Sequence, residues 1–392
     1  MKLYESTKKR MIHKNKESFK TPTNPFTHIL MRSFKMKTIA IIGLGKWGKN
    51  HVRNICRLQT EGFCDKVVIC DQDINQLKSI GEINNIPVEN RYSNLDELLA
   101  KEKIAGAILA IPTAIHKKIA LQMLEHCDIL CEKPLAPTVE DCKEISEKAK
   151  KLNRIVQVGH LERYNPVIVT LKSFLEKEET EDKIMHLTGR RVGPGPTRLD
   201  SKDLDPNYLG CGHDFMVHDI DVVNGLLGKI PKRVIATSAY IEGFPHEVEL
   251  FAVFEYEGFK GQETNPILFD CRATWRAYPN LKRRKLIVQT TKDVITLDFI
   301  LQSIMMEKGL AQHSLSNSFS EYLGAYRATE ITNHYLATGK DQEPLYLEDK
   351  DFLDCIDTRK KPLVSDVEGT DAVKCVVAAI EAAKTGKAVE IK

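Results

Sequence analysis

The sequence predicts a mixed α/β protein in which a doubly wound parallel sheet precedes an α+β domain built on a large, mainly antiparallel sheet. Up to about residue 160, short apolar runs alternate with longer segments of helical periodicity, as in parallel strands joined by crossover helices. Beyond that point, β-rich segments follow one another with turn residues between them, which indicates antiparallel pairing. The chain, at 392 residues, is also longer than one ordinary core requires.

Strands and helices are expected to alternate in the first domain. The first strand, residues 37–42, enters a glycine-rich loop, and a helix opens there and continues to about residue 57. The further predicted strands are 66–70, 106–110, 128–131 and 155–158, and the further predicted helices are 74–83, 95–100, 115–125 and 139–152. The sequence therefore predicts a first domain over residues 37–160 and a second over residues 161–392.

The second domain is expected to bind the substrate and to carry the contacts of a homo-oligomer. Its predicted strands are 234–241, 247–254, 268–273 and 286–297, and a helix is predicted over 370–384. Val373, Val376, Val377 and Ile380 follow helical spacing in that last segment, and Gly386 is expected to end it.

Residues 1–36 are interpreted as a disordered extension. Residues 1–37 contain ten Lys or Arg against two Glu, so the remaining chain is mildly acidic although the net charge is +3. An amphipathic targeting segment or a tether to an anionic surface are the alternatives for this extension. The charge gives no support for a nucleic-acid partner, and no stretch approaches the roughly 20 apolar residues of a membrane span. Ten cysteines without a C-x-x-C pair favour reduced thiols in a cytoplasmic protein.

The glycine-rich loop predicts a dinucleotide site. Gly43-x-Gly45-x-x-Gly48 follows an apolar strand and opens a helix, the context in which such glycines admit a pyrophosphate. Asp71 comes 23 residues after Gly48 at the end of the second strand, where a carboxylate binds ribose hydroxyls and repels a 2′-phosphate. This predicts a Rossmann domain with NAD as the cofactor, and a solvated loop acid is the alternative for Asp71. The predicted cofactor contacts are Gly43, Gly45, Lys46, Trp47, Gly48, Asp71, Thr113, His116, Glu132 and Lys133.

Lys133 is the first candidate for catalysis. The string Glu132-Lys133-Pro134 follows an apolar strand, at the sheet edge where wound α/β folds bind ligands. A lysine there can donate to a substrate hydroxyl and stabilise its ionised form. A surface lysine at a strand end is the alternative interpretation.

Asp214 and His218 are the other catalytic candidates. Their i, i+4 spacing places both side chains on one face of a helix over residues 214–226. A neutral imidazole with a pKa near 6.5 can accept a hydroxyl proton as a general base. A structural histidine is one alternative, and a metal site from His213, Asp214, His218, Asp219 and Asp221 is another. We expect no catalytic metal, because no other cluster supplies the remaining ligands.

With these motifs, the chain resembles the Gfo/Idh/MocA oxidoreductases from about residue 37 to residue 392. The resemblance includes Asp214-x-x-x-His218-x-x-Asp221, the string Pro362-Leu363-Val364-Ser365, and Gly369. It implies that Lys133, Asp214 and His218 line a substrate pocket beside the nicotinamide. His218 would take a hydroxyl proton and Lys133 would stabilise the alkoxide as hydride leaves.

A narrower resemblance is to the branch that acts on nucleotide sugars, particularly UDP-N-acetylglucosamine 3-dehydrogenases. It rests on the segments 159–166, 191–194 and 218–221. It implies a 3-keto product that a pyridoxal-phosphate aminotransferase consumes in lipid A or surface polysaccharide synthesis. The segment Gly210-Cys211-Gly212-His213 departs from the expected apolar run. The predicted substrate contacts are Arg163, Tyr164, Asn165, Arg191, Arg198, Asp214 and His218.

Other functions remain open at this point. A dehydrogenase of a free polyol or cyclitol would use the same three catalytic candidates, as would one acting on a UDP-sugar uronate. A non-catalytic NAD-dependent sensor belongs to a different class. It would have no need of a base opposite the nicotinamide.

Overall fold

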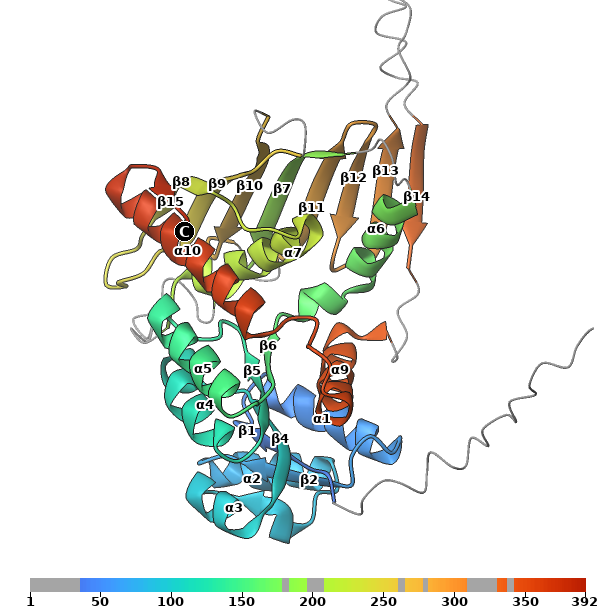
Figure 1. Cartoon of the computed structure of the whole chain (residues 1–392), viewed down its shortest axis with the longest axis vertical. Coiled ribbons are helices and arrows are strands. Elements are labelled where there is room, and N and C mark those ends of the chain that lie inside the picture. The colour runs from blue at the N-terminus through green and yellow to red at the C-terminus, as the bar shows by residue number, and fades with distance from the viewer. Residues whose placement is uncertain are drawn as a thin grey trace, which may run out of the picture. The chain divides into compact units, whose positions relative to one another are not determined.

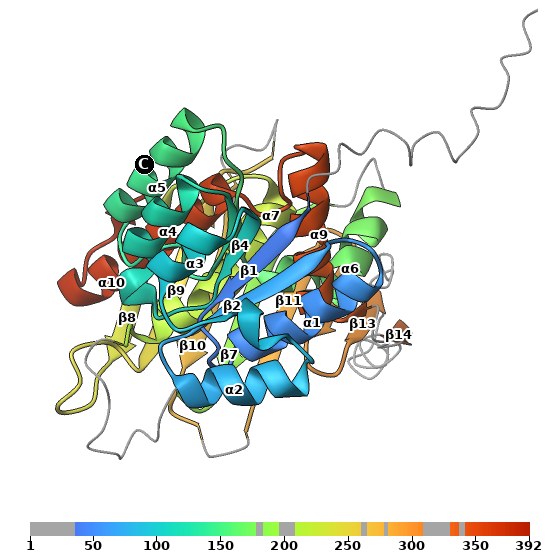
Figure 2. The ribbon, with the colours of Figure 1, turned by 90° about the horizontal axis from the view of Figure 1, so that it is seen from below.

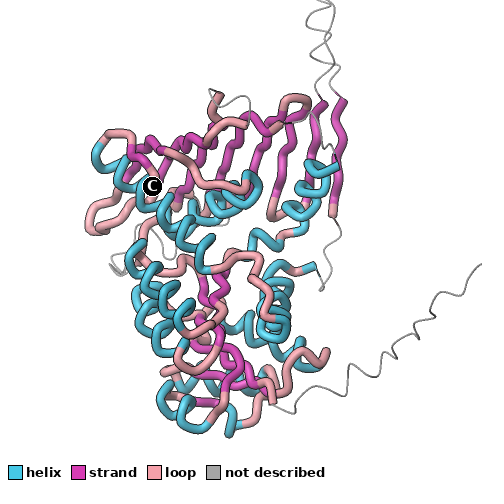
Figure 3. Tube along the Cα trace, viewed as in Figure 1, coloured by secondary structure: helices cyan, strands magenta, loops and turns pink. Residues whose placement is uncertain are grey.

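The computed structural model describes residues 36–177, 183–195, 208–259, 265–277, 281–308, 330–336 and 342–392. Residues 37–392 form one compact unit, and of the predicted extension only Met36 falls among the described residues. The strands of this unit gather into two sheets, which are drawn in magenta in Figure 3. Within the described ranges, no helix combines the length and apolarity needed to cross a bilayer.

The first sheet has six parallel strands in the order β3-β2-β1-β4-β5-β6, the order of a dinucleotide-binding fold. The strands are β1 (Thr38–Ile42), β2 (Lys66–Cys70), β3 (Arg91–Tyr92), β4 (Ile104–Leu109), β5 (Asp128–Glu132) and β6 (Val156–Gly159). The helices are α1 (Gly48–Thr60), α2 (Ile74–Ile83), α3 (Leu95–Lys101), α4 (His116–Leu124) and α5 (Val139–Lys151). The predicted fold is confirmed, and the short strand β3 is an addition to it.

Helices cover both faces of this sheet, as seen from below in Figure 2. Ile39 and Ile41 of β1 pack in the core that includes residues of α1 and α2, while Ala40 and Ile42 pack in the core that includes residues of α4 and α5. This alternation is the period of two expected for a strand that is buried on both faces. The side chains of Asp73, Asn94 and Thr138 cap the N-termini of α2, α3 and α5.

The second sheet has nine strands in the order β14-β13-β12-β11-β7-β10-β9-β8-β15. Only the pair β7 and β10 is parallel among these described strands. The strands are β7 (Ile184–Val192), β8 (Arg233–Ala239), β9 (Glu249–Tyr256), β10 (Ile267–Thr274), β11 (Arg283–Thr290), β12 (Asp293–Asp298), β13 (Ser303–Lys308), β14 (Glu330–Tyr335) and β15 (Val389–Glu390). The mainly antiparallel sheet predicted for this region is therefore confirmed.

The segment 286–297, which was predicted as one strand, is a hairpin of β11 and β12. The Thr290 hydroxyl accepts hydrogen bonds from the backbone N–H groups of Lys292 and Asp293. A short polar side chain that bonds its own backbone in this way stabilises a turn. Residues 289–293 are all polar, and this interruption of the apolar pattern was the signal of the turn that the prediction overlooked.

Three helices cover the face of the second sheet that is directed toward the first sheet (Figure 1). They are α6 (Pro166–Lys177), α7 (Val217–Leu227) and α10 (Asp366–Thr385). Helix α10 starts earlier than predicted, because Ser365 and Glu368 form a reciprocal capping box. It ends at Gly386, whose φ of +66° is the left-handed conformation favoured at a helix C-terminus.

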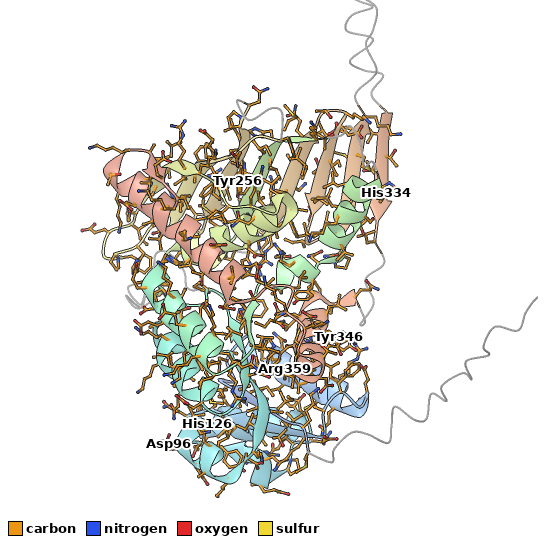
Figure 4. All side chains as sticks on the ribbon, viewed as in Figure 1. Asp96, His126, Tyr256, His334, Tyr346 and Arg359 are labelled. Atoms are coloured by element: carbon orange, nitrogen blue, oxygen red, sulfur yellow. The ribbon has the colours of Figure 1, made fainter. Side chains whose placement is uncertain are left out.

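Helix α9 (Pro344–Thr358) returns to the first sheet. Its residues Tyr346, Phe352 and Leu353 belong to the same buried cluster as Ile39 and Ile41 of β1. Figure 4 labels Tyr346 and also Arg359, which follows the helix and forms an ion pair with Asp128 at the start of β5. A late segment of the chain thus completes the core of the nucleotide-binding half.

Candidate active site

The glycine loop between β1 and α1 has the geometry of a dinucleotide cradle. Gly43 has a φ of +89°, and a Cβ there would lie 2.5 Å from the Ala110 carbonyl oxygen. A Cβ on Gly48 would lie 1.8 Å from the Gly43 carbonyl oxygen. A Cβ on Gly45 would meet no described atom within 4 Å, and this residue is exposed. Gly43 and Gly48 thus close the turn, while Gly45 leaves the approach to the backbone open for a diphosphate.

Asp71 links this loop to the end of β2. Its Oδ2 accepts a hydrogen bond from Leu44 N at 2.6 Å, and its Oδ1 accepts one from Asp73 N at 2.8 Å. Each carboxylate oxygen keeps a lone pair, so the side chain can still accept from ribose hydroxyls. The residues present therefore fit a dinucleotide. Lys46 and Trp47 lie exposed in the same loop.

The other predicted cofactor residues lie at the neighbouring strand ends. Thr113 is half-buried in a single turn after β4. The ring nitrogens of His116 lie 2.9 Å from the Ile111 carbonyl oxygen and 3.0 Å from that of Pro134. His116 therefore ties the end of β4 to the residue after Lys133. Burial lowers the pKa of His116, although these carbonyls favour its charged form.

Glu132 belongs to a buried polar chain behind the lysine. Its Oε1 lies 3.2 Å from His51 Nε2, and His51 Nδ1 lies 2.7 Å from Asp349 Oδ1 of α9. Burial lowers the pKa of His51, but the Asp349 and Glu132 carboxylates outweigh it and hold this pKa well above 6.5. Glu132 Oε2 also accepts from Lys133 N at 3.2 Å. These contacts among Asp349, His51 and Glu132 fix the backbone from which the Lys133 side chain extends.

Lys133, directly after β5, and Asp214, in the helical turn before α7, come together from the two halves of the unit. Lys133 Nζ donates to Asp214 Oδ1 at 3.0 Å and to the Asp214 carbonyl oxygen at 2.9 Å. The lysine side chain is only 9% exposed. Trp275 Nε1 donates to the other carboxylate oxygen of Asp214 at 3.3 Å. The ammonium is therefore held at the junction between the two halves of the unit.

His218 lies in the first turn of α7, and a π-helical turn (Gly212–Met216) carries Asp214 directly before it. The sequence predicted one uniform helix for Asp214 and His218, whereas the structure changes from a π-helix to an α-helix between them. His218 is buried, and its Nδ1 has no hydrogen-bond partner among the described residues. Burial, and after it the charges of Lys133 and Arg191, hold the pKa of His218 well below 6.5. Its imidazole is therefore neutral at pH 7.

Two further histidines lie near Lys133: His160, which was not predicted as a site residue, and His213, which was considered only as a ligand of the alternative metal site. His160 directly follows β6, and its ring meets that of His218 edge-on with centroids 6.1 Å apart. Neither ring nitrogen of His160 has a hydrogen-bond partner within the described part of the chain, nor does Nε2 of His213. Burial and the Lys133 charge lower the pKa of His160 to about 3, and burial lowers that of His213 to about 4. The signal for His160 was its place at a strand end on the ligand-binding edge.

Two predicted substrate arginines form internal interactions. Arg191 is 1% exposed and donates twice to Asp219 Oδ1, at 2.8 and 3.0 Å, and once to Glu162 Oε1 at 3.1 Å. Arg163 is buried and donates to the Asp221 carbonyl oxygen at 2.9 Å. Both guanidinium groups thus hold helix α7 or its neighbours in place. Their contact with substrate stays a prediction.

Tyr164 and Asn165, two further predicted substrate residues, also form hydrogen bonds within the protein. The Tyr164 hydroxyl donates to Asp351 at 2.8 Å. The Asn165 side chain accepts from Val167 N at 3.2 Å and so supports the start of α6. Arg198 lies outside the described residues. Among the described His, Cys, Asp and Glu residues, no group of three is arranged to hold a metal ion.

Arg284 is a charged residue beside this site that the sequence argument missed. It lies on β11 directly opposite Arg191 of β7, and its Nη1 is 3.6 Å from Glu162 Oε1. Its charge acts on both Asp214 and His218. The available signal was its position in a strand of alternating burial, where it falls on the inward face.

Comparison with known proteins agrees with the fold and with the dinucleotide-binding motif. Residues 37–160 match the Gfo/Idh/MocA family, which is described as an oxidoreductase family with an NAD-binding Rossmann fold. Inositol 2-dehydrogenase of Corynebacterium glutamicum (strain R) is 26% identical over 198 residues, or 50% of this chain and 55% of that protein. The chain thus spans about half the length of that curated relative. The scyllo-inositol 2-dehydrogenase (NAD(+)) of Bacillus subtilis (strain 168) is 21% identical over 365 residues, 90% of this chain and 95% of that protein.

The fold also matches a solved structure over both halves. The structure of UDP-N-acetylglucosamine 3-dehydrogenase GnnA from Acidithiobacillus ferrooxidans superposes with a TM-score of 0.69 at 17% identity. The alignment covers 89% of this chain and 97% of that one. The strand order, the glycine loop and the strand-end acid together define an NAD-binding oxidoreductase fold. Residues 37–160 thus carry the NAD-binding Rossmann domain of the Gfo/Idh/MocA oxidoreductase family.

Proposed function

We propose that this protein is an NAD-dependent dehydrogenase that oxidises a ring hydroxyl of a sugar. The observation that carries the proposal is the contact between Lys133 and Asp214, which come from the two halves of the unit, beside the buried neutral imidazole of His218. A donor, a proton acceptor and a dinucleotide cradle are the groups that alcohol oxidation requires. A sensor that only binds NAD would have no use for the first two.

The residues have separate roles in this mechanism. NAD, when bound in the glycine cradle, supplies the hydride acceptor. His218, neutral at pH 7, takes the hydroxyl proton at a ring nitrogen, and Lys133 Nζ donates to the oxygen as its negative charge grows. Asp214 orients Lys133 through the 3.0 Å contact. Asp71 favours NAD over NADP, because a carboxylate repels a 2′-phosphate.

We propose UDP-N-acetylglucosamine, oxidised at its 3-hydroxyl, as the substrate. The segments 159–166, 191–194 and 218–221 support this choice, as does the fold shared with GnnA. The 3-keto product suits a pyridoxal-phosphate aminotransferase as the next enzyme, because oxidation of a secondary alcohol by NAD is usually uphill near neutral pH. Nine of the ten free cysteines are buried, which fits a reduced cytoplasmic protein. A homo-oligomer is part of the proposal.

A free polyol is the second candidate substrate. The inositol 2-dehydrogenases that match this chain act on a cyclitol, and the scyllo-inositol enzyme matches over 90% of this chain. The same three residues would serve that reaction. The two candidates differ in whether a uridine diphosphate group is needed for binding.

The test is NADH formation from NAD with UDP-N-acetylglucosamine, other nucleotide sugars and myo-inositol. Product masses identify the oxidised sugar, and an added aminotransferase with an amino donor draws an uphill equilibrium forward. Lys133→Met is expected to lower kcat/KM by about 10²- to 10⁴-fold, because it removes the donor to the oxygen.

The control is Lys118→Met, which changes an exposed lysine of α4 and is expected to leave the rate unchanged. Normal turnover by Lys133→Met would contradict the assignment of the lysine. Absence of NADH with every sugar would favour the sensor.

A further inference from the structure

Two arginines face each other across the inward side of the second sheet. The register pairs Arg284 of β11 with Arg191 of β7, and the residues that follow on the same face, Leu286 and Gly189, are paired in turn. Like charges directly opposite each other destabilise a strand pair. The fold therefore needs anions beside both arginines.

The nearby carboxylates neutralise Arg191 much better than Arg284. Arg191 makes three hydrogen bonds to Asp219 and Glu162, and it is almost fully buried. The guanidinium of Arg284 contacts Glu162 only through a 3.6 Å ion pair, and it makes no hydrogen bond to the part of the chain that the structure describes. Its side chain is 35% exposed. Its planar fork of N–H donors therefore has capacity for another acceptor.

We propose that Arg284 binds an anionic group of the sugar substrate, either a carboxylate or a phosphate. The inference rests on the proposed function, because it places the substrate against Lys133, Asp214 and His218. An arginine fork matches both anions with two parallel hydrogen bonds. The reacting sugar is thus an acid or a phosphate ester and not a neutral polyol.

The electrostatics of His218 support the same arrangement. Arg284 is one of the cations that lower the pKa of His218. Burial and the Arg191 charge lower the pKa of Arg284 itself, which is the expected strain between two facing cations. An anion bound at Arg284 would offset its field at His218 and make the imidazole a better proton acceptor. Binding of the anionic substrate would thus strengthen His218 as a proton acceptor.

The test compares wild-type protein with Arg284→Gln, Arg284→Lys and the matched control Arg283→Gln. Arg283 is exposed, and it precedes Arg284 on the opposite face of the same strand. The probes are UDP-N-acetylglucosamine for the phosphate, glucuronate for the carboxylate and myo-inositol as the neutral sugar. KM and kcat are measured with each, and dissociation constants are measured by calorimetry with NAD present.

Arg284→Gln is expected to raise KM and the dissociation constant of one anionic probe by about 10- to 100-fold, the cost of losing charged hydrogen bonds. The values for myo-inositol stay unchanged, Arg283→Gln behaves as wild type, and Arg284→Lys lies between because it keeps the charge without the fork. The affected probe identifies the anion. The apparent pKa of the base in the kcat/KM profile rises in Arg284→Gln, because a cation near His218 is gone.

Equal losses for neutral and anionic probes, or failure of wild-type protein to bind either anionic probe, would overturn the inference. Thermal unfolding of each variant separates a folding defect from a binding defect, and Arg284→Lys serves if Arg284→Gln fails to fold. The binding measurements do not depend on turnover. A protein that binds the anion through Arg284 but forms no NADH would therefore refute the proposed function and leave this inference standing.

Discussion

At the scale of single residues, the site is a cluster of uncharged imidazoles around one ammonium group. His160, His213 and His218 are all buried, and each has at least one ring nitrogen without a described hydrogen-bond partner. A buried polar atom without a partner costs about 1–3 kcal/mol, so such atoms need an explanation in function. We infer that substrate hydroxyls and ordered water form hydrogen bonds with these ring nitrogens.

Replacing His160 should reduce the loss of stability in acid. The pKa of His160 is about 3 in the folded protein against about 6.5 when unfolded, so below pH 6.5 the unfolded chain takes up a proton that the folded protein does not. The free energy of unfolding of wild type is expected to fall by about 1 kcal/mol more than that of His160→Asn between pH 6 and pH 5. Urea unfolding at the two pH values measures this difference.

His126→Asn is the control for this prediction, because His126 is an exposed histidine at the end of α4, visible in Figure 4. The control is expected to keep the pH dependence of wild type. Identical slopes for wild type and His160→Asn would show that His160 is not held neutral in the folded protein.

At the scale of elements, two glycines of the loop between β1 and α1 have different roles: Gly45 leaves space for the cofactor, and Gly48 allows the helix to pack closely on the loop. Gly45→Ala is expected to leave the free energy of unfolding near that of wild type, because its Cβ meets open space, but to weaken NAD binding by about tenfold or more. Gly48→Ala is expected to lose about 1–3 kcal/mol of stability as well, because its Cβ collides with the Gly43 carbonyl. Urea unfolding and NAD titration measure the two effects.

Each of these variants is the control for the other, since they lie three residues apart in one loop. Wild-type NAD affinity in Gly45→Ala would show that no diphosphate approaches the backbone there. Wild-type stability in Gly48→Ala would contradict the close approach of the helix to the strand.

The sequence predicted elements whose signal is local. The strand, glycine loop and helix up to residue 57 follow from spacing alone, as does the position of Asp71. Helix α9 escaped detection because two charged residues, Glu348 and Asp349, interrupt its buried face. The roles of Arg191 and Arg284 also escaped, because they depend on Glu162 and Asp219, which are distant in sequence and meet these arginines only in the folded protein.

At the scale of the whole molecule, α10 joins the two halves of the unit. Val373 of this helix is buried in the core of the first sheet, while Ala372 and Cys375 are buried in that of the second. Gly369, in the first turn, allows a close approach to β6, since a Cβ there would lie 2.6 Å from Val158 Cγ2. The two cores are therefore expected to unfold together.

Gly369→Val should lower the melting temperature of both halves at once. The added side chain overpacks the contact with Val158, which typically costs about 1–3 kcal/mol. Scanning calorimetry is expected to show one peak at lower temperature, with NAD binding lost over the same range. Glu381→Ala, on the exposed side of the same helix, is the control and should melt as wild type does. Two separated peaks in either protein would contradict a shared core.

The return of α9 to the first sheet has a consequence for biosynthesis. A nascent chain whose strands β1 to β6 have all left the ribosome still lacks Phe352 and Leu353, which share their buried cluster with Ile39 and Ile41. It also lacks Asp349, so His51 has only one of its two carboxylates. The nucleotide-binding half consequently reaches its final packing late in translation. Until then, the apolar surface that α9 covers stays exposed to water, where chaperones can bind it.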